Sequence, residues 1–108
     1  MSRHSIGALD TFPEGAGTKI EIGSATIAVF RVEDCVYAIA DRCSHAEASL
    51  SEGELFGFEI ECPRHGAEFD IRTGAVCSLP ATKPVASYTT EITNGEVVLT
   101  IEDEASDE

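Results

Sequence analysis

Residues 62–70 read C-P-R-H-G-A-E-F-D, and this short stretch places two kinds of metal-binding side chain in one tight loop. Cys62 and His65 lie three positions apart, and the proline and glycine beside them suit a sharp change of chain direction. The residues around the stretch, 56–61 and 67–71, alternate between hydrophobic and polar and predict a strand on each side. We therefore expect a ligand loop between two β-strands.

A second loop repeats the pattern earlier in the chain. D-R-C-S-H at 41–45 offers Cys43 and His45 after another alternating segment. A Cys₂His₂ zinc finger takes two cysteines from one hairpin and two histidines from one helix, whereas each loop here is mixed. Two such loops can give both thiolates to one metal and both imidazoles to another, as in a [2Fe–2S] centre with two histidines on one iron. Mononuclear zinc and a purely structural quartet are the alternatives.

The rest of the chain also shows the two-residue period of β-strands, and helical periodicity is weak. Strands are predicted at 18–22, 25–32 and 36–40, followed after the ligand loops by a closing hairpin that turns at Asn94-Gly95. A helical turn is expected only at 46–52, and the two prolines of 79–84 indicate a loop or sheet edge. The predicted fold class is all-β, a small antiparallel sandwich or barrel.

Composition limits the partners. The 108 residues predict one domain, 1–108, with its cluster-binding part at about 41–80 and an acidic tail at 102–108. Seven basic and 20 acidic residues give a net charge of −13, which disfavours nucleic acid and anionic membranes and favours protein partners with basic docking faces. The first residues lack the apolar region of a signal peptide, so we expect a cytoplasmic protein whose four cysteines serve metal or redox chemistry.

Other chemically notable residues are interpreted as structural. Cys35 and Cys77 are expected to be small buried or edge hydrophobic residues, although a disulfide between them stays open. His4 is expected to be solvated near a loose terminus. Arg42 and Arg64 adjoin the ligands and could tune the site, steer docking or simply be solvated. The aromatic residues expected in the core are Phe30, Tyr37, Phe56, Phe58 and Phe69.

C-S-H at 43–45 and C-P-R-H-G at 62–66 resemble the Rieske motif, C-x-H and then, after sixteen residues, C-x-x-H. The resemblance extends through F-D-I-R-T-G and L-P-A-T-K-P, so it covers essentially the whole chain. It implies one Rieske-type [2Fe–2S] cluster held by a subdomain of two loops in a small antiparallel β domain. By this resemblance Cys43 and Cys62 bind one iron, and His45 and His65 bind the other.

Two classes of protein carry such a domain in the resembling families, oxygenases and electron carriers. An oxygenase needs a second iron on a 2-His-1-carboxylate triad, and only His4 remains for it in this short chain. The sequence therefore looks like the ferredoxin component of bacterial multicomponent aromatic-ring dioxygenases, which is not itself an enzyme. The resemblance implies a soluble, monomeric one-electron carrier between an NAD(P)H-dependent flavoprotein reductase and a terminal non-haem iron oxygenase.

Two further functions remain open at this point. Similar short sequences accompany iron–sulfur assembly systems as electron donors or accessory proteins, and small subunits of nitrite reductases share the fold. High-potential Rieske proteins bridge their ligand loops with a disulfide and carry a serine and a tyrosine beside the cluster. At the corresponding positions this chain has Ala48, Arg64, Ala67 and Phe69, so we expect a potential near the low end of the Rieske range, about −150 mV.

Overall fold

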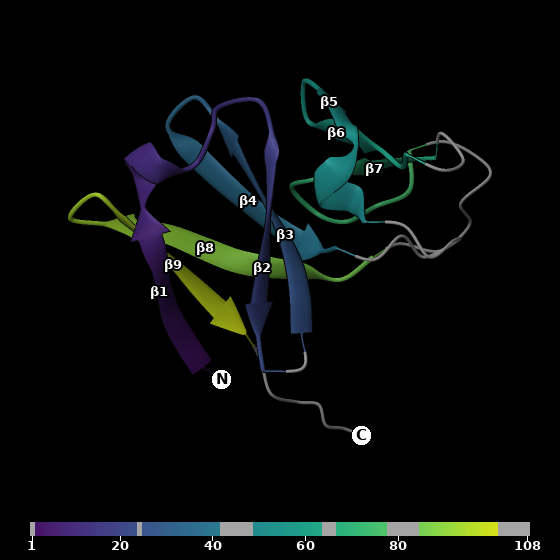
Figure 1. Cartoon of the computed structure of the whole chain (residues 1–108). Coiled ribbons are helices and arrows are strands. Elements are labelled where there is room, and N and C mark those ends of the chain that lie inside the picture. The colour runs from purple at the N-terminus through teal and green to yellow at the C-terminus, as the bar shows by residue number, and fades with distance from the viewer. Residues whose placement is uncertain (1, 24, 42–48, 64–66, 78–84, 102–108) are drawn as a thin grey trace.

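The computed structural model describes residues 2–23, 25–41, 49–63, 67–77 and 85–101 (Figure 1). In this part of the chain nine strands and two short 3₁₀ turns form, and no helix is long and apolar enough to cross a membrane. The strands are β1 Ser2–Ala8, β2 Gly17–Ile22, β3 Ala25–Val32, β4 Cys35–Ala40, β5 Glu54–Phe56, β6 Glu59–Glu61, β7 Glu68–Asp70, β8 Ser87–Thr93 and β9 Glu96–Ile101. The 3₁₀ turns are η1 Leu9–Thr11 and η2 Leu50–Glu52.

The strands form two antiparallel sheets. The large sheet has the order β1-β9-β8-β4-β3-β2, and the small sheet has the order β5-β6-β7. Figure 1 shows the large sheet curving on one side of the molecule and the small sheet beside it, next to β3 and β4. The predicted fold class, all-β and antiparallel, is confirmed.

The closing hairpin forms at the predicted turn. Asn94 has φ 53° and Gly95 has φ 80°, the two positive values that a two-residue turn of type I′ requires. This turn sets the register that pairs Thr93 with Glu96. The hairpin of β8 and β9 therefore follows from local sequence alone.

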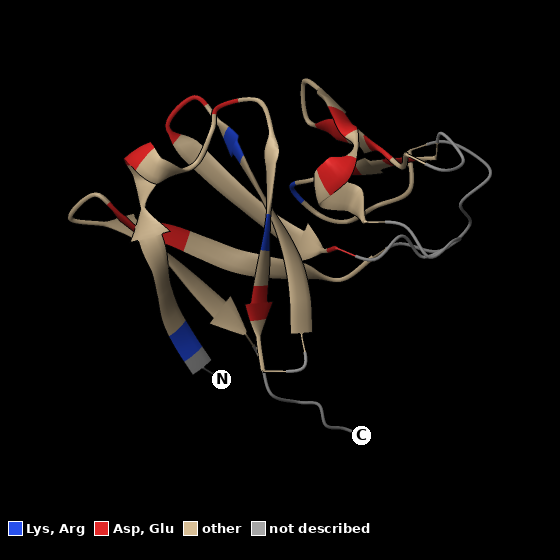
Figure 2. Ribbon diagram, viewed as in Figure 1, with Lys and Arg blue, Asp and Glu red and all other residues tan. Residues whose placement is uncertain are grey.

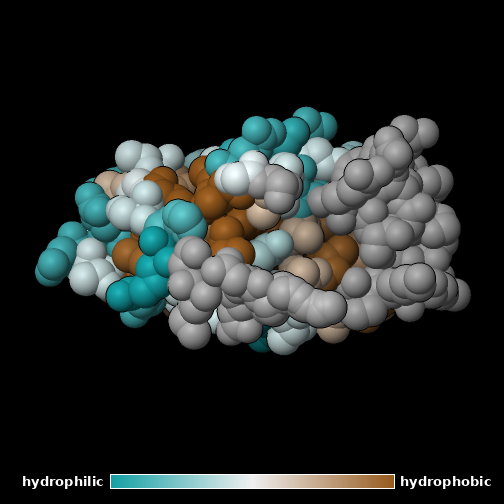
Figure 3. Space-filling model, turned by 90° about the horizontal axis from the view of Figure 1, so that it is seen from below, coloured by the Kyte–Doolittle hydropathy of each residue, from teal (hydrophilic) through white to brown (hydrophobic). Residues whose placement is uncertain are grey.

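Two hydrophobic clusters form the core, and β3 lies between them. The first cluster, inside the large sheet, contains Phe12, Ile27, Val29, Val36, Ala38, Val97 and Leu99. The second joins the large sheet to the small one and contains Ala28, Phe30, Ile39, Leu50, Ile60, Cys62, Ala67, Phe69, Ile71 and Val85. Successive β3 side chains face opposite clusters, which explains why residues 27–30 are all hydrophobic and all buried. Some hydrophobic side chains still reach the surface, as a broken band on the underside (Figure 3).

Two sequence predictions are wrong in the second half of the fold. The segment 56–61 is not one strand, because Gly57 has φ 64° and turns the chain between β5 and β6. Phe56 lies on the outer face of this small hairpin, and 54% of it is exposed, so it is not a core residue. Phe30 and Phe69 are buried as predicted, while Tyr37 and Phe58 pack at the border of the second cluster.

The N-terminal segment also differs from its prediction. Instead of a loose terminus it forms β1, which pairs along its length with β9 and places His4 opposite Leu99. His4 is half-buried there. Of the predicted helical turn at 46–52, the described part is η2 from residue 50, and residues 46–48 lie outside the described residues. The segment 79–84 and the acidic tail 102–108 lie outside them as well.

Candidate metal centre

Cys62 lies directly after β6, at the border of the small sheet and the second hydrophobic cluster. Its side chain is a free thiol and is 1% exposed. Its backbone N–H donates to the carbonyl of Ala67 over 2.7 Å, immediately beyond the pairing of Glu61 with Glu68. The two residues that flank segment 63–66 are thus hydrogen-bonded to each other, and the thiol of Cys62 is buried in the protein.

Segment 42–48 carries the other predicted ligand pair. The residues on its two sides are also joined by a backbone hydrogen bond. The N–H of Leu50 donates to the carbonyl of Asp41 over 2.6 Å. The Asp41 carboxylate accepts the Ser49 hydroxyl over 2.5 Å and the Ser51 N–H over 2.9 Å. Asp41 is 3% exposed, so this connection is made inside the protein.

Val85, which follows a third segment, 78–84, is also held by a backbone hydrogen bond. The N–H of Val85 donates to the carbonyl of Gly74 over 2.9 Å. Gly74 has φ 82°, and a Cβ on it would lie 2.0 Å from the Val85 carbonyl oxygen, so only glycine fits here. Leu50, Cys62, Ala67 and Val85, which lie next to or close after the three segments, all belong to the second hydrophobic cluster.

Of the four predicted ligands, the structure describes Cys62. Cys43, His45 and His65 lie outside the described residues, and within the described residues no group of three or more potential ligands is positioned to hold a metal ion. Cys62 itself fits the predicted group, because a cluster ligand must be an unpaired cysteine whose sulfur is shielded from water. Two thiolates and two imidazoles are also the donor set that a Rieske centre takes.

Ala67 and Phe69 occupy the positions where high-potential Rieske proteins have hydroxyl-bearing side chains. Both are fully buried in the second cluster, Ala67 at the end of segment 63–66 and Phe69 in β7. Neither has a side-chain donor, so neither can donate a hydrogen bond to a cluster sulfur from these positions. Ala48 and Arg64 lie outside the described residues.

The remaining cysteines are separate from this site. Cys35 and Cys77 are both free and exposed, so there is no disulfide between them, and of the two expected positions, buried or at an edge, the buried one is wrong. Partial desolvation and the nearby carboxylate of Glu59 raise the pKa of the Cys77 thiol.

A cluster of side chains that the sequence analysis did not identify joins the small sheet to β4. The Arg72 guanidinium donates twice to the Asp70 carboxylate, over 3.0 and 2.9 Å, and these hydrogen bonds lower the pKa of Asp70. The same guanidinium lies 4.3 Å from the centre of the Phe58 ring, and Tyr37 meets that ring edge-on at 5.8 Å. The local signal was D-I-R, an acid and a base two positions apart in the turn after β7.

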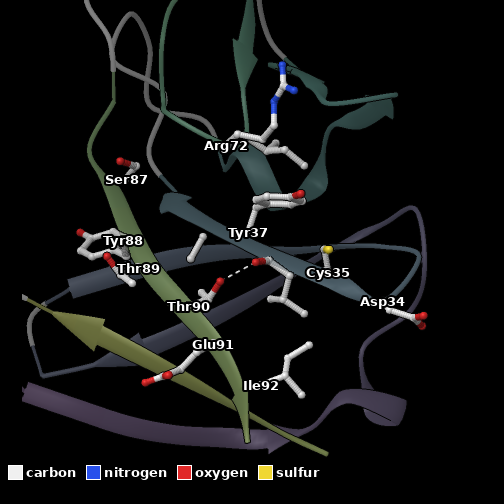
Figure 4. A pocket seen from close by; sticks show the side chains of 13 residues that line it. Asp34, Cys35, Tyr37, Arg72, Ser87, Tyr88, Thr89, Thr90, Glu91 and Ile92 are labelled. Carbon is white, nitrogen blue, oxygen red and sulfur yellow. Dashed lines mark hydrogen bonds between the residues drawn. The ribbon is translucent and has the colours of Figure 1, made fainter.

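A cavity of about 470 Å³ opens below Arg72, where the pairing of β4 and β8 ends (Figure 4). The strands separate beyond Ala38 and Tyr88, and the Thr90 hydroxyl bridges the gap by donating to the Val36 carbonyl over 2.5 Å. Cys35 and Tyr37 line this cavity. Cys62, the described member of the proposed ligand set, is not among the described residues that line the cavity.

A model of the Rieske [2Fe-2S] domain matches residues 2–89, and the chain belongs to this family. Domains of this family bind a [2Fe–2S] cluster through two cysteines and two histidines, and the cluster carries one electron at a time. The chain is 42% identical over 98 residues to the anthranilate 1,2-dioxygenase ferredoxin subunit of Burkholderia cepacia, covering 91% of each chain.

Solved structures give the same relationship. The ferredoxin of carbazole 1,9a-dioxygenase from Nocardioides aromaticivorans IC177 superposes with a TM-score of 0.90 at 36% identity, covering 94% of this chain and all of that one. A ferredoxin solved in complex with the oxygenase of carbazole 1,9a-dioxygenase superposes with a TM-score of 0.85 at 40% identity. The match covers 90% of this chain and 91% of that one. A putative nitrite reductase small subunit from Mycobacterium tuberculosis gives 0.82 at 20% identity, which shows a shared fold.

Proposed function

We propose that this protein is a Rieske ferredoxin that carries single electrons from an NAD(P)H-dependent flavoprotein reductase to a terminal non-haem iron oxygenase. The observation that carries the proposal is Cys62, a buried unpaired thiol in the hydrophobic cluster that also contains Leu50 and Val85, residues close to segments 42–48 and 78–84. The relatives that match nearly the full chain are named as ferredoxins of aromatic dioxygenase systems, which supports the same role. It is an electron-transfer component, not a catalyst of its own.

In this proposal Cys43 and Cys62 bind one iron and His45 and His65 the other. The bound cluster supplies the one-electron redox chemistry. The protein fixes the ligand-bearing segments at their flanking residues, through the hydrogen bonds of Asp41 and of the Cys62 amide. It also surrounds Cys62 with hydrophobic side chains, which limits the access of water to the site.

The potential follows from the same residues. Without hydroxyl donors at Ala67 and Phe69, the negative charge of the reduced state receives less stabilisation from hydrogen bonds. We therefore expect about −150 mV, a value suited to flavin donors and to a second low-potential Rieske centre as acceptor. Such a protein would be a poor shuttle between quinol and a high-potential cytochrome.

The charge of the small sheet supports partners with basic docking faces. Its outer face presents the exposed ring of Phe56 and a set of carboxylates from all three strands, namely Glu54, Glu59, Glu61, Glu68 and Asp70. Figure 2 shows this concentration of acidic residues on β5 and β6, the strands that lead to Cys62. Acidic charge beside the site would speed the encounter with a basic partner and orient it.

The alternative as a nitrite reductase small subunit rests on fold alone, because the identity to that structure is 20%. We expect the carrier to act as a monomer in the cytoplasm. A monomer would meet its two protein partners in turn rather than form one permanent assembly.

Reconstitution tests the proposal. The purified protein, loaded with iron and sulfide, should be reduced by the NADH-driven ferredoxin reductase of an aromatic dioxygenase and should then reduce the matching oxygenase, one electron per chain. Voltammetry should place the wild type at about −150 mV and show a higher potential for the Ala67→Ser, Phe69→Tyr double variant. A positive wild-type potential, or a protein isolated in a tight complex with a sulfite- or nitrite-reducing subunit, would contradict the proposed role.

A further inference from the structure

Asp41 is the buried charged residue of the described structure, with 3% of its surface exposed. It follows β4 and precedes segment 42–48. Every hydrogen-bonding group of the residue is engaged: its N–H donates to the Thr26 carbonyl over 3.0 Å, and its carbonyl accepts the Leu50 N–H. Its carboxylate oxygens accept the Ser49 hydroxyl and the Ser51 N–H. One residue therefore connects β3 with both ends of segment 42–48.

The Asp41 carboxylate is held by neutral groups. Both of its oxygens act as acceptors, as an ionised carboxylate does, and no Lys, Arg or His among the described residues forms an ion pair with it. The Ser49 hydroxyl also lies 2.9 Å from that of Ser51, which extends the network by one member. Burying a charged group costs stability unless its hydrogen-bonding atoms have partners, and residues directly after segment 42–48 provide partners for both carboxylate oxygens of Asp41.

The position of Asp41 suggests a role at the metal centre. Segment 42–48 contains Cys43 and His45, and two residues of chain put the α-carbon of Cys43 at most about 7 Å from that of Asp41. A negative charge close to a redox centre in a water-poor environment disfavours the addition of an electron. Hydrogen bonds to both ends of the segment also limit the positions that its ligands can take.

We propose that Asp41 is a positioning residue of the iron–sulfur site, which holds the ends of the first ligand segment together and whose charge lowers the reduction potential. This inference rests on the proposed function, since it assumes a cluster on Cys43, His45, Cys62 and His65. Two variants separate the effect of the hydrogen bonds from the effect of the charge. Asp41→Asn keeps an acceptor for the Ser51 N–H and a donor for the Ser49 oxygen but removes the charge. Ser49→Ala removes one hydrogen bond and keeps the charge.

The experiment uses the loaded full-length protein and four variants: Asp41→Asn, Asp41→Ala, Ser49→Ala and Asp10→Asn. Asp10 lies exposed in η1 and forms no capping hydrogen bond, so its variant is the matched control for the change in net charge. The first measurement is the reduction potential by voltammetry at fixed pH and salt. The second is the rate of iron release to a chelator, followed by the loss of visible absorbance.

Asp41→Asn should favour the reduced state at least threefold, a rise of about 28 mV at 59 mV per tenfold, and should release iron at a rate within twofold of the wild type. Ser49→Ala should release iron several-fold faster with little change of potential, and Asp41→Ala should show both effects. Asp10→Asn should match the wild type in both measurements. An Asp41→Asn potential equal to that of Asp10→Asn, or iron held by Asp41→Ala as long as by the wild type, overturns the assignment. A wild type without a Rieske spectrum would overturn the proposed function instead.

Discussion

The two sheets of this protein are held together in different ways. The large sheet has strands of six to eight residues, short turns between most neighbours and continuous ladders of backbone hydrogen bonds. The small sheet has strands of three residues. Its position depends on the second hydrophobic cluster and on individual contacts made by Asp41, Arg72 and Gly74.

This difference suggests a division of labour. The hairpins of the large sheet, β2–β3, β3–β4 and β8–β9, follow from local sequence, because their pairings are long and their turns are tight. The small sheet carries Cys62 and depends on a few contacts between residues far apart in the chain. We expect that a bound metal centre adds stability mainly to this second region, since its backbone pairing alone is short.

The largest effect is expected from the ligands. Replacing Cys43, His45, Cys62 or His65 singly should abolish or grossly alter the cluster, because each supplies one of four bonds to iron. Iron and acid-labile sulfide analysis with visible spectroscopy measures this. Far-ultraviolet circular dichroism should show that the large sheet persists in these variants.

Cys35→Ser and Cys77→Ser are the matched controls for the cysteine variants, since both residues are free and exposed. Each should keep two irons and two sulfides per chain. Loss of the cluster in either control, or its retention in Cys62→Ser, would show that the ligand assignment is wrong.

The next effect compares one glycine from each region. Gly74 and Gly95 both have positive φ, but a Cβ on Gly74 would meet the Val85 carbonyl oxygen, whereas a Cβ on Gly95 would meet nothing within 4 Å. Gly95→Ala should cost about 1–2 kcal/mol from backbone strain alone. Gly74→Ala should cost about 3 kcal/mol or more, because the strain is joined by a clash with backbone, and it should also speed the release of iron. Denaturant unfolding measures both, and equal losses would show that Gly74 and Val85 do not lie as close as described.

A smaller, pH-dependent effect compares the two ion pairs of the described residues. Arg72 lowers the pKa of Asp70, so the pair stabilises the fold above the unfolded pKa of an aspartate, about 3.9, and this contribution is lost as the pH falls through the lower, folded value. Arg72→Gln should thus be less stable than the wild type at neutral pH, with a difference that narrows in acid.

Arg3→Gln is the matched control, because Arg3 pairs with Glu91 across the large sheet and both side chains are at least half exposed. Its stability should differ little from that of the wild type at any pH. Unfolding curves from about pH 7 to about pH 3 compare the two variants. If the difference in stability between Arg72→Gln and the wild type stays constant over that range, the ionised Asp70 is not its cause.

The smallest effect concerns docking. Glu54→Gln with Glu61→Gln should slow reduction by the reductase roughly threefold at low salt, because the pair lies on the acidic outer face of the small sheet. The control variant, Asp10→Asn with Glu21→Gln, removes the same number of charges outside that face. It should slow reduction by the reductase less. Stopped-flow rates at low and high salt measure this, and two identical salt dependences would argue against a localised docking face.

The sequence predicted the scaffold well for physical reasons that are visible in single elements. The hydrophobic run of β3 and the Asn94-Gly95 turn are local signals, and both were confirmed. The hairpin of β5 and β6 was missed because three-residue strands are too short to show alternation, although Gly57 was a turn signal. β1 was missed because its partner, β9, is nearly a chain length away.

The candidate site was predicted as a motif, but its surroundings were not. The Cys/His spacing predicts the ligand residues, and the family match agrees with the kind of cluster that this prediction implies. The role of Asp41 depends on hydrogen bonds to residues eight and ten positions later, which no spacing rule reveals. Likewise, the exposure of Cys35, Cys77 and Phe56 depends on where each lies in the folded chain and not on its residue type.

The most direct test of the account is electron paramagnetic resonance of the reduced protein, prepared with ¹⁵N-labelled histidine. The account predicts one unpaired electron for every two irons and hyperfine coupling to two histidine nitrogens, one each from His45 and His65. Either single variant, His45→Cys or His65→Cys, should remove one of these couplings or the whole signal. A paramagnetic cluster without histidine coupling, or a colourless protein that contains one zinc, would contradict the assignment of a Rieske centre to these residues.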